Sequence, residues 1–349
     1  MQRSKGLRHH PAAWVVLMLA AAWSGCSGKP EARSAGDGAL ETLELRYQGS
    51  NSAVLLHELA EDLGYLSPLK LKWVGNTISG PQDIQTVVTG DVDVGGAFNG
   101  AIIKLVSAKA PIRAIVGYYG VDDQTWSGFF VKEDSPIRSP RDLIGKKISV
   151  NTLGAHSEFM VREYLTRAGL TPEEIKQVTL LVIPPINGEQ ALRQGQVDVA
   201  ALGSIFRDKA LERGGLRRLF SDHELYGTFT AGSLVVTHKT LRERPNAVRK
   251  LVEGTGRAIE WARSQPREVV RQRMTDIIKK RGRGEDPTIV QYWRSPGIAL
   301  PGGRIADREF QIWIDWLTRD GVLKPGQIAL RDLFTNEFSA FPASEQARK

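Results

Sequence analysis

The phrase Gly-x-Val-Asp-Val occurs twice in this chain, at residues 90–94 and 195–199, and it constrains the fold more than any other feature. Each copy follows a helix-like segment, and its glycine stands where a helix needs a residue with positive φ in order to end. The valines alternate with aspartate as in a β-strand, and small residues follow. Either helix–strand junctions reuse glycine by chance, or the chain contains two similar α/β lobes.

The remainder of the chain favours two lobes. Strand-like and helix-like segments alternate from residue 43, which predicts a mostly parallel sheet with helices on both faces. At 349 residues the chain exceeds the usual size of one domain. We expect the first lobe to comprise residues 42–128 plus 232–340, mainly helical after 241, and the second lobe to comprise 129–231. Small residues near 126–131 and 229–234 predict the hinge connections.

The N-terminus has the pattern of an export signal. Basic residues precede an apolar run from Ala12 to Trp23, which is shorter than the roughly 20 residues that span a bilayer. Ser24-Gly25-Cys26 resembles a bacterial lipoprotein signal, although Trp23 replaces the usual leucine. We therefore expect a signal peptide at 1–25, a lipidated Cys26 and a flexible tether over 26–41. The alternative is an ordinary secretory signal cut near residues 20–22, with Cys26 incidental.

Charge and motifs exclude several classes of function. The formal net charge is +8, which is mild for this length and suits anionic ligands or membranes rather than a nucleic-acid partner. The sequence contains no Walker A motif and no Gly-x-Ser-x-Gly elbow. Its histidines lack metal-binding spacing and Cys26 is its only cysteine, so we expect no metal, no cofactor and no disulfide. Asp93 and Asp198 are interpreted as mid-strand residues with local hydrogen bonds rather than a catalytic pair.

The order of these segments resembles the periplasmic substrate-binding proteins of ABC importers, and residues 42–340 look like the nitrate/sulfonate/taurine-binding group. The segments that carry the resemblance are YQGSNSAV (47–54), SGP (79–81), GDVDVGGAFNGA (90–101) and VKEDSPIRSPRDLIGKKISVNTLGAHSEFMVREYLTRAGL (131–170). This resemblance implies an α/β fold of the bilobal periplasmic-binding-protein type II, with two βα lobes, a hinge and a helical C-terminal region. Many relatives carry an acidic-Pro-aromatic segment where this chain has Gly203-Ser204-Ile205-Phe206, which leaves the ligand subclass open.

Loops that follow strands at the cleft are the expected ligand site, because ligands of open α/β sheets bind outside the carboxyl ends of the strands. These loops contain hydroxyls, amides and helix N-termini but neither lysine nor arginine, which suits an oxyanion held by neutral donors. Arg207 is the exception that would supply a charge, and Trp126 is expected either to line the cleft or to be buried for structure. The predicted ligand-binding residues are Gln48, Ser50, Asn51, Ser79, Gly80, Gly96, Phe98, Asn99, Trp126, Asn151, Thr152, Gly154, Ala155, Ser204 and Arg207.

The resemblance implies a non-enzymatic, monomeric solute-binding protein in the periplasm or on the outer face of the cytoplasmic membrane. It would be lipid-anchored, capture a small organic anion such as a sulfonate or taurine, and deliver it to an ABC permease with a cytoplasmic ATPase. Nitrate, bicarbonate and a thiamine-pyrimidine precursor are alternative ligands on the same fold. A pyrimidine-synthase-like enzyme and a ligand-sensing lipoprotein are the alternatives from other classes of function.

Overall fold

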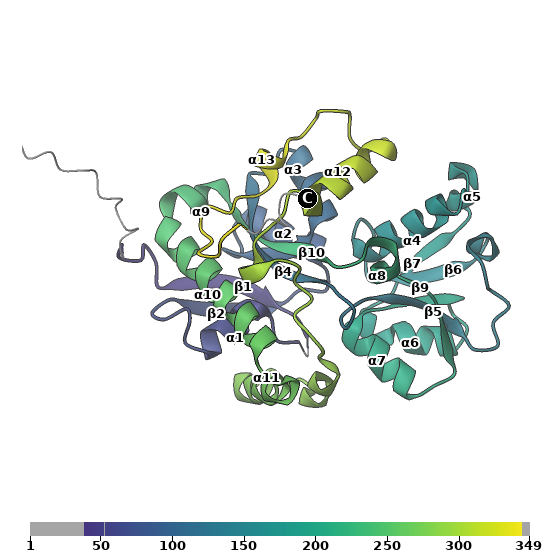
Figure 1. Cartoon of the computed structure of the whole chain (residues 1–349), viewed down its shortest axis with the longest axis horizontal. Helices are drawn as coiled ribbons and strands as arrows, with labels where there is room; N and C mark the ends of the chain where they lie inside the picture. The colour runs from purple at the N-terminus through teal and green to yellow at the C-terminus, as the bar shows by residue number, and fades with distance from the viewer. Residues whose placement is uncertain (1–37, 52, 344–349) are drawn as a thin grey trace, which may run out of the picture. The chain divides into compact units, whose positions relative to one another are not determined.

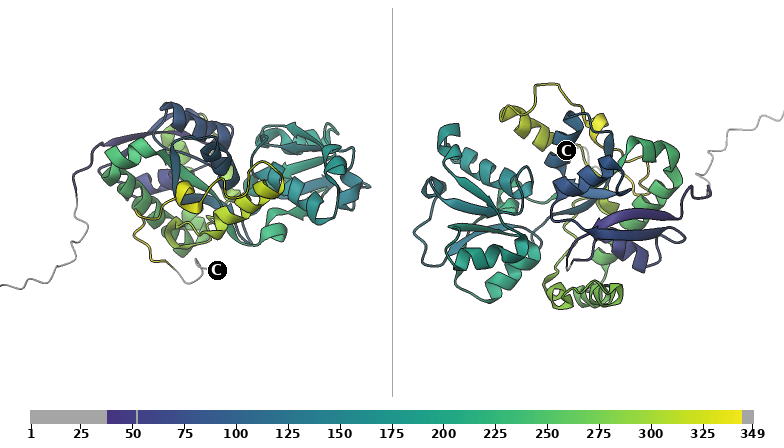
Figure 2. Two further views of the ribbon diagram at one scale, coloured as in Figure 1. Left: turned by 90° about the horizontal axis from the view of Figure 1, so that it is seen from above. Right: turned by 180° about the vertical axis from the view of Figure 1, so that it is seen from behind.

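The computed structural model describes residues 38–51 and 53–343, and the chain from Ala39 onward forms one compact unit. The predicted signal peptide and Cys26 lie outside the described residues. The strands form sheets of two, three and five strands, which are divided between two lobes (Figure 1). Figure 2 shows the two lobes from above and from behind. Among the described residues, no helix is both long and apolar enough to cross a membrane.

The first lobe is built on strands that follow the order β2-β1-β3-β10-β4. Strands β1 and β2 pair in parallel, and a parallel bridge between Tyr47 and Val94 joins β1 to the approach of β3. Strand β10 lies between β3 and β4 and is antiparallel to both. The bounds are β1 Glu44–Gly49, β2 Lys70–Asn76, β3 Gly95–Phe98, β4 Ile112–Val121 and β10 Phe229–Thr237.

The second lobe repeats this arrangement with the strand order β7-β6-β8-β5-β9. Here β6 is parallel to β7 and β8, whereas β5 is antiparallel to β8 and β9. The expectation of a mostly parallel sheet is therefore corrected: the five-stranded sheet of the second lobe is mixed, and the first lobe joins a parallel pair, β1-β2, to an antiparallel sheet, β3-β10-β4. The reason is the chain crossing: each antiparallel strand is the one by which the chain enters from the other lobe. The bounds are β5 Gly128–Lys132, β6 Lys147–Val150, β7 Thr179–Val182, β8 Val199–Leu202 and β9 Leu216–Ser221.

Helices cover both sheets, and several tryptophans anchor the core. In the first lobe α1 packs against α10 and α12 packs against α3. Trp313 and Trp316 of α12 are buried, as expected for core anchors, whereas Trp261 is only partly buried. The first-lobe helices are α1 Leu56–Asp62, α2 Gly80–Thr89, α3 Asn99–Ser107, α9 His238–Glu243, α10 Pro245–Ser264, α11 Arg267–Arg281, α12 Arg308–Arg319 and α13 Leu330–Leu333, with 3-10 turns at Pro287–Tyr292 and Pro301–Gly303.

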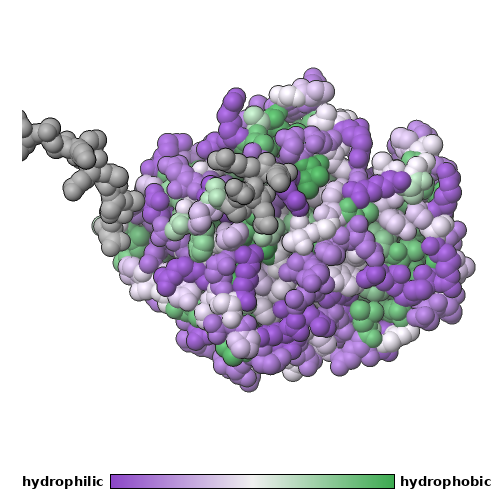
Figure 3. Space-filling view, viewed as in Figure 1, coloured by the Kyte–Doolittle hydropathy of each residue, from purple (hydrophilic) through white to green (hydrophobic). Residues whose placement is uncertain are grey.

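The second-lobe helices are shorter and follow its strands in turn. Helix α4 also contacts the first lobe, since Phe159 stacks on Trp316 with ring centroids 4.2 Å apart. The surface shown in Figure 3 is mostly hydrophilic, with scattered hydrophobic patches. The helices are α4 His156–Arg167, α5 Pro172–Lys176, α6 Pro185–Arg193, α7 Ser204–Glu212 and α8 Asp222–Tyr226, with a 3-10 turn at Pro140–Leu143.

The repeated phrase performs the same structural task in both lobes. Gly90 and Gly195 have φ values of 84° and 71°, the left-handed conformation that ends a helix. Each aspartate then pairs with the strand next to it. Asp93 Oδ2 accepts from the backbone N–H of Arg46 at 2.8 Å, and Asp198 Oδ2 accepts from that of Lys147 at 2.8 Å. The predicted local hydrogen bonding is confirmed.

The predicted mid-strand position of the two aspartates is wrong. Strand β3 begins at Gly95 and β8 begins at Val199, so Asp93 and Asp198 precede their strands. The physical reason is that a carboxylate, rather than a backbone carbonyl, receives the neighbouring N–H at this point. The aspartate therefore fixes where each strand meets its neighbour, and the small residues that follow are directed to the sheet edge.

The chain crosses between lobes slightly earlier than the sequence suggested. Residues 122–127 connect β4 to β5, and Gly227 and Thr228 connect α8 to β10. Gly232 and Ser233, which were expected in a hinge connection, instead lie inside β10 and are buried. Gly232 has no side chain because Tyr119 and the backbone of Ala97 in β3 occupy the space that a Cβ would need.

Candidate functional site

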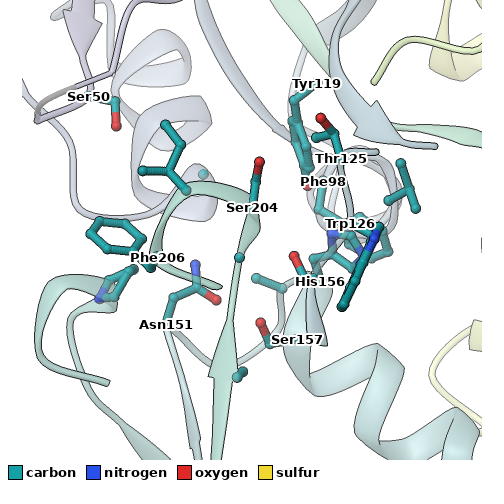
Figure 4. A pocket seen from close by; sticks show the side chains of 18 of the residues that line it. Ser50, Phe98, Tyr119, Thr125, Trp126, Asn151, His156, Ser157, Ser204 and Phe206 are labelled. Carbon is teal, nitrogen blue, oxygen red and sulfur yellow. The ribbon is translucent and has the colours of Figure 1, made fainter. Parts of the chain in front are cut away.

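A cavity of about 440 Å³ lies where loops from the carboxyl ends of strands in both lobes meet. Its wall combines the end of β4, the crossing segment 122–127 and the first turns of several helices. Figure 4 shows side chains from both lobes around it. The lining residues are Ser50, Gly80, Pro81, Phe98, Tyr118, Tyr119, Gly120, Val121, Thr125, Trp126, Ser127, Ser149, Asn151, Ala155, His156, Ser157, Ile183, Pro185, Gly188, Ala201, Gly203, Ser204, Ile205, Phe206 and Pro296.

Helices α2, α3, α4, α6 and α7 all begin at this cavity. Their N-cap residues make no side-chain capping hydrogen bond, a feature that they share with α1, α10, α11, α12 and α13, whereas α5, α8 and α9 are capped by hydroxyls. The first N–H groups of a helix have no partner within it, and the helix dipole makes this end positive. The uncapped residues are Ser79, Phe98, Ala155, Pro184 and Gly203. Several first turns therefore present donors to one space, which suits an oxyanion.

The wall of the cavity carries no formal charge. Among the described residues that line it there is no aspartate, glutamate, lysine or arginine. His156 is the titratable imidazole of the wall, and burial lowers its pKa to about 4, so it is neutral at pH 7. The polar side chains are hydroxyls and one amide, that of Asn151. No group of three or more metal-ligating side chains occurs in the described part of the chain.

Aromatic rings form much of the remaining wall. Phe98 stacks on His156 with ring centroids 5.1 Å apart and nearly parallel planes. Tyr119 and Phe206 also line the cavity, and Trp126 closes it at the crossing segment (Figure 4). Such rings offer flat apolar contact area to the body of a ligand, while the helix ends offer hydrogen bonds to its polar end.

Arg207 does not line the cavity but supports Trp126 from behind. Its guanidinium lies 3.9 Å from the indole ring and donates to the Trp126 carbonyl at 2.9 Å. It also pairs with Asp208 at 2.7 Å, and its side chain is only 3% exposed. The guanidinium that the sequence suggested Arg207 would offer a ligand is thus engaged by Asp208, whose other carboxylate oxygen accepts from Arg294 Nε at 2.6 Å.

The structure brings about half of the predicted site residues to the cavity. Ser50, Gly80, Phe98, Trp126, Asn151, Ala155 and Ser204 line it. The others stand just outside: Gln48, Asn51, Ser79, Gly96, Asn99, Thr152, Gly154 and Arg207.

Asn99 illustrates why some of the predicted residues do not line the cavity. It is fully buried, and its amide donates to the carbonyls of Thr230 at 3.1 Å and Glu309 at 3.2 Å. Its Oδ1 accepts from Ser233 Oγ at 2.9 Å. All of these bonds are internal, so Asn99 ties β3 to β10 and α12 instead of facing a ligand.

The ligand residues predicted from the sequence do not include Tyr118, Tyr119, Thr125 or His156, all of which line the cavity. Tyr118 and Tyr119 lie toward the end of β4, and Thr125 follows in the crossing segment. The rule that ligands bind at strand ends, applied to β4, would have found the tyrosines. His156 and Ser157 are the first helical residues of α4, where the sequence pointed to the preceding loop instead.

Comparisons with known proteins agree with this geometry. The family model described as NMT1/THI5 like matches residues 59–269. A curated protein of Escherichia coli (strain K12), whose name describes an aliphatic sulfonates-binding protein, is 29% identical over 212 residues. That match covers 59% of this chain and 62% of the relative, so the chain spans less than two thirds of the relative's length.

Solved structures share the fold at low sequence identity. The alkanesulfonate-binding protein SsuA from Xanthomonas axonopodis pv. citri, bound to MOPS, has a TM-score of 0.66 and 21% identity, over 85% of this chain and 100% of that one. The periplasmic nitrate-binding protein NrtA from Synechocystis PCC 6803 has a TM-score of 0.65 and 12% identity, over 86% and 88%. The bilobal periplasmic-binding-protein fold is thereby established.

Proposed function

We propose that this chain, which belongs to the NMT1/THI5-like family, is the extracytoplasmic solute-binding component of an ABC import system. In this proposal it captures a small organic anion in the cavity between its lobes and delivers it to a permease with a cytoplasmic ATPase. The observation that carries the proposal is the neutral cavity onto which the uncapped N-termini of α2, α3, α4, α6 and α7 converge.

Neutral donors suit a carrier that must release its ligand. An anion bound by backbone N–H groups and hydroxyls gains hydrogen bonds and a favourable helix dipole. A buried arginine would add a strong, charge-assisted bond that the permease would then have to break. Arg207, which the sequence suggested would supply a charge, is already paired with Asp208 at 2.7 Å.

The lining favours an organic sulfonate over the other ligands considered. Aromatic side chains and a volume of about 440 Å³ suit an apolar body, which nitrate and bicarbonate lack. No carboxylate belongs to the described lining, so the ammonium group of taurine would have no ionic partner. We therefore propose that simple alkane- or arenesulfonates bind more tightly than taurine.

For ligand contacts we propose Ser50, Gly80, Phe98, Trp126, Asn151, Ala155 and Ser204, with Tyr119, Thr125, His156 and Ser157 in addition. The predicted residues outside the lining would act by shaping the loops. We also propose two lobes divided at the crossings seen in the structure, residues 122–127 and 227–228. Lipidation at Cys26 and a monomer held at the membrane by this anchor complete the proposal.

Thermal unfolding in the presence of candidate ligands tests the proposal. A ligand at 100 times its dissociation constant stabilises the folded protein by about 2.7 kcal/mol. Ethanesulfonate and benzenesulfonate are expected to raise Tm, whereas nitrate, bicarbonate, taurine and an aminopyrimidine at equal concentration raise it less or not at all. A rise with the aminopyrimidine alone, or with nitrate alone, would replace the sulfonate proposal by that alternative.

Two alternatives from other classes of function have distinct signatures. A pyrimidine-synthase-like enzyme would convert its ligand, and mass spectrometry of the incubated ligand would reveal the product. A sensing lipoprotein would bind ligand equally well but would not support uptake. Transport of radiolabelled benzenesulfonate in cells with and without the chain separates a carrier from a sensor.

A further inference from the structure

His156 and Asp222 form a buried pair at one end of the cavity. His156 is the first residue of α4, and its Nε2 lies 3.3 Å from Asp222 Oδ2. The two atoms are at ion-pair distance but are not aligned for a hydrogen bond, so Nε2 is buried without a partner. The Asp222 side chain is fully buried, whereas that of His156 is 14% exposed and belongs to the cavity wall.

The imidazole stands in a box of aromatic rings. Phe98 stacks on it, and the centroids of Tyr119 and Phe229 lie 6.1 Å and 6.0 Å from its own. These rings hold the imidazole in place and exclude water, which makes an isolated charge costly and a paired charge effective. With Nε2 directed to Asp222, Nδ1 is the ring nitrogen left for a ligand.

Asp222 links this pair to the crossing segment. Its two carboxylate oxygens accept from the backbone N–H of Ser127 at 3.0 Å and 3.1 Å, and Oδ1 accepts from that of His223 at 2.8 Å. The Asp222 N–H in turn donates to the Ser127 carbonyl at 3.1 Å. The carboxylate is therefore held rigidly between the cavity and the connection between the lobes.

Resting on the proposed function, we propose that His156 and Asp222 share a proton that serves as the counter-charge for the bound anion. The anion accepts from Nδ1–H of a His156 imidazolium, whose Nε2–H faces the Asp222 carboxylate. Binding then takes up a proton from solvent whenever the free pair carries none. No bond of the ligand breaks, and the proton leaves again when the anion departs.

The titratable and charged groups around His156 and Asp222 are mostly engaged elsewhere, so the shared proton remains with this pair. Arg207 of α7 is near Asp222 but is paired with Asp208. Glu158, on the same helix as His156, is engaged by Arg162 at 2.7 Å. Tyr119 of β4 stays protonated, because burial raises its pKa far above the neutral range. His223 follows Asp222 in α8, and Lys104 of α3 approaches the loop at Gly154.

The protonation of the free pair changes close to neutral pH. Burial raises the pKa of Asp222 to about 7 and lowers that of His156 to about 4. Between these values the pair holds one proton and is neutral overall. Above pH 7 it becomes net negative and repels an anion, so the affinity is expected to fall by up to about tenfold per pH unit there.

Titration calorimetry with benzenesulfonate, which is ionised throughout, tests the inference at pH 6.5, 7.5 and 8.5. Wild type is expected to lose about tenfold in affinity between pH 7.5 and 8.5. Runs in triethanolamine and in Tris, two cationic buffers that differ in ionisation heat, are expected to show uptake approaching one proton at pH 8.5. Binding with a constant Kd and no proton uptake overturns this inference and leaves the proposed function standing. Absence of binding to any anion overturns both.

Variants separate the pair from other buried acids. Burial also raises the pKa of Asp83 and Glu309 to about 7. His156→Gln is expected to bind weakly at pH 6.5 and to show no pH slope, and Asp222→Asn is also expected to lose the slope. His223→Gln is the matched control and keeps the wild-type slope. A slope that survives in His156→Gln and disappears in Asp83→Asn assigns the proton to Asp83 and refutes the pair, even if Asp222→Asn fails to fold.

Discussion

The same substitution at two asparagines should separate a structural from a ligand-binding role. Asn99 and Asn151 both follow strands and were both predicted to bind ligand, but only Asn151 lines the cavity. Asn99 makes three internal hydrogen bonds at 2.9–3.2 Å in a fully buried position. We expect Asn99→Ala to lower stability and Asn151→Ala to lower affinity.

The magnitudes follow from the partners that each substitution leaves. Asn99→Ala removes three hydrogen bonds worth about 1 kcal/mol each, so the free energy of unfolding should fall by about 3 kcal/mol. Asn151→Ala removes one donor to a buried ligand, which costs about 1–3 kcal/mol of binding, or roughly 5- to 150-fold in Kd. Its effect on the free protein should stay within about 0.5 kcal/mol, because no hydrogen bond of its own side chain to the protein is broken.

Urea unfolding and titration calorimetry on both variants decide the matter. Asn99→Ala, measured at a temperature where it is folded, should bind benzenesulfonate within a few-fold of wild type. If Asn99→Ala abolished binding at unchanged stability, its buried hydrogen bonds would not be its role, and the cavity assigned here would be the wrong site. Wild-type affinity in Asn151→Ala would remove that residue from the site.

Four further outcomes are expected. Arg207→Ala should destabilise the protein by about 3 kcal/mol in thermal or urea unfolding, because it removes buried hydrogen bonds to Asp208 and to the carbonyls of Trp126 and Gln124, while Asp208 keeps its pair with Arg294. It should weaken binding less than Asn151→Ala and Ser204→Ala together; complete loss of binding with normal stability would restore Arg207 as a ligand residue. Small-angle scattering should show a smaller radius of gyration with saturating benzenesulfonate, and an unchanged radius would contradict lobe closure. Incorporation of a lipid precursor should disappear in Cys26→Ala, and equal labelling of both proteins would refute the anchor. Burial raises the pKa of Asp83 to about 7, so its protonated carboxyl contributes stability at acid pH that is lost as pH rises through 7. The Tm of wild type should therefore fall from pH 6 to 8 more than that of Asp83→Asn. Parallel curves of Tm against pH would contradict this.

The sequence predicted the architecture well because that part of the problem is local. A glycine that ends a helix, a short valine-rich strand and a small-residue loop are readable from adjacent residues, and their repetition indicated two similar lobes. The direction of β5 and β10 was not readable, since it depends on where the chain crosses between lobes. Short-range sequence patterns do not reveal where the chain crosses between the lobes.

The site was predicted only in part, because the fate of a polar side chain depends on distant partners. Asn99 and Asn151 look alike in sequence, and only the positions of Thr230 and Glu309 show that the first is already bonded. Arg207 is likewise kept out of the cavity, because it donates to the carbonyl of Trp126, which precedes it by 81 residues in the sequence. His156 was overlooked as a candidate because its partner Asp222 lies in another helix of the same lobe.

The repeated phrase also explains why so many helix N-termini meet in one cavity. In each lobe the aspartate fixes the start of a short central strand, β3 or β8, against its neighbour. The helix that follows, α3 or α7, therefore begins at the carboxyl edge of its sheet. Residues at the start of both helices, Phe98 before α3 and Gly203 and Ser204 at α7, line the same cavity. An anion bound there interacts with the positive ends of helices from both lobes, so its charge favours closure of the lobes around it.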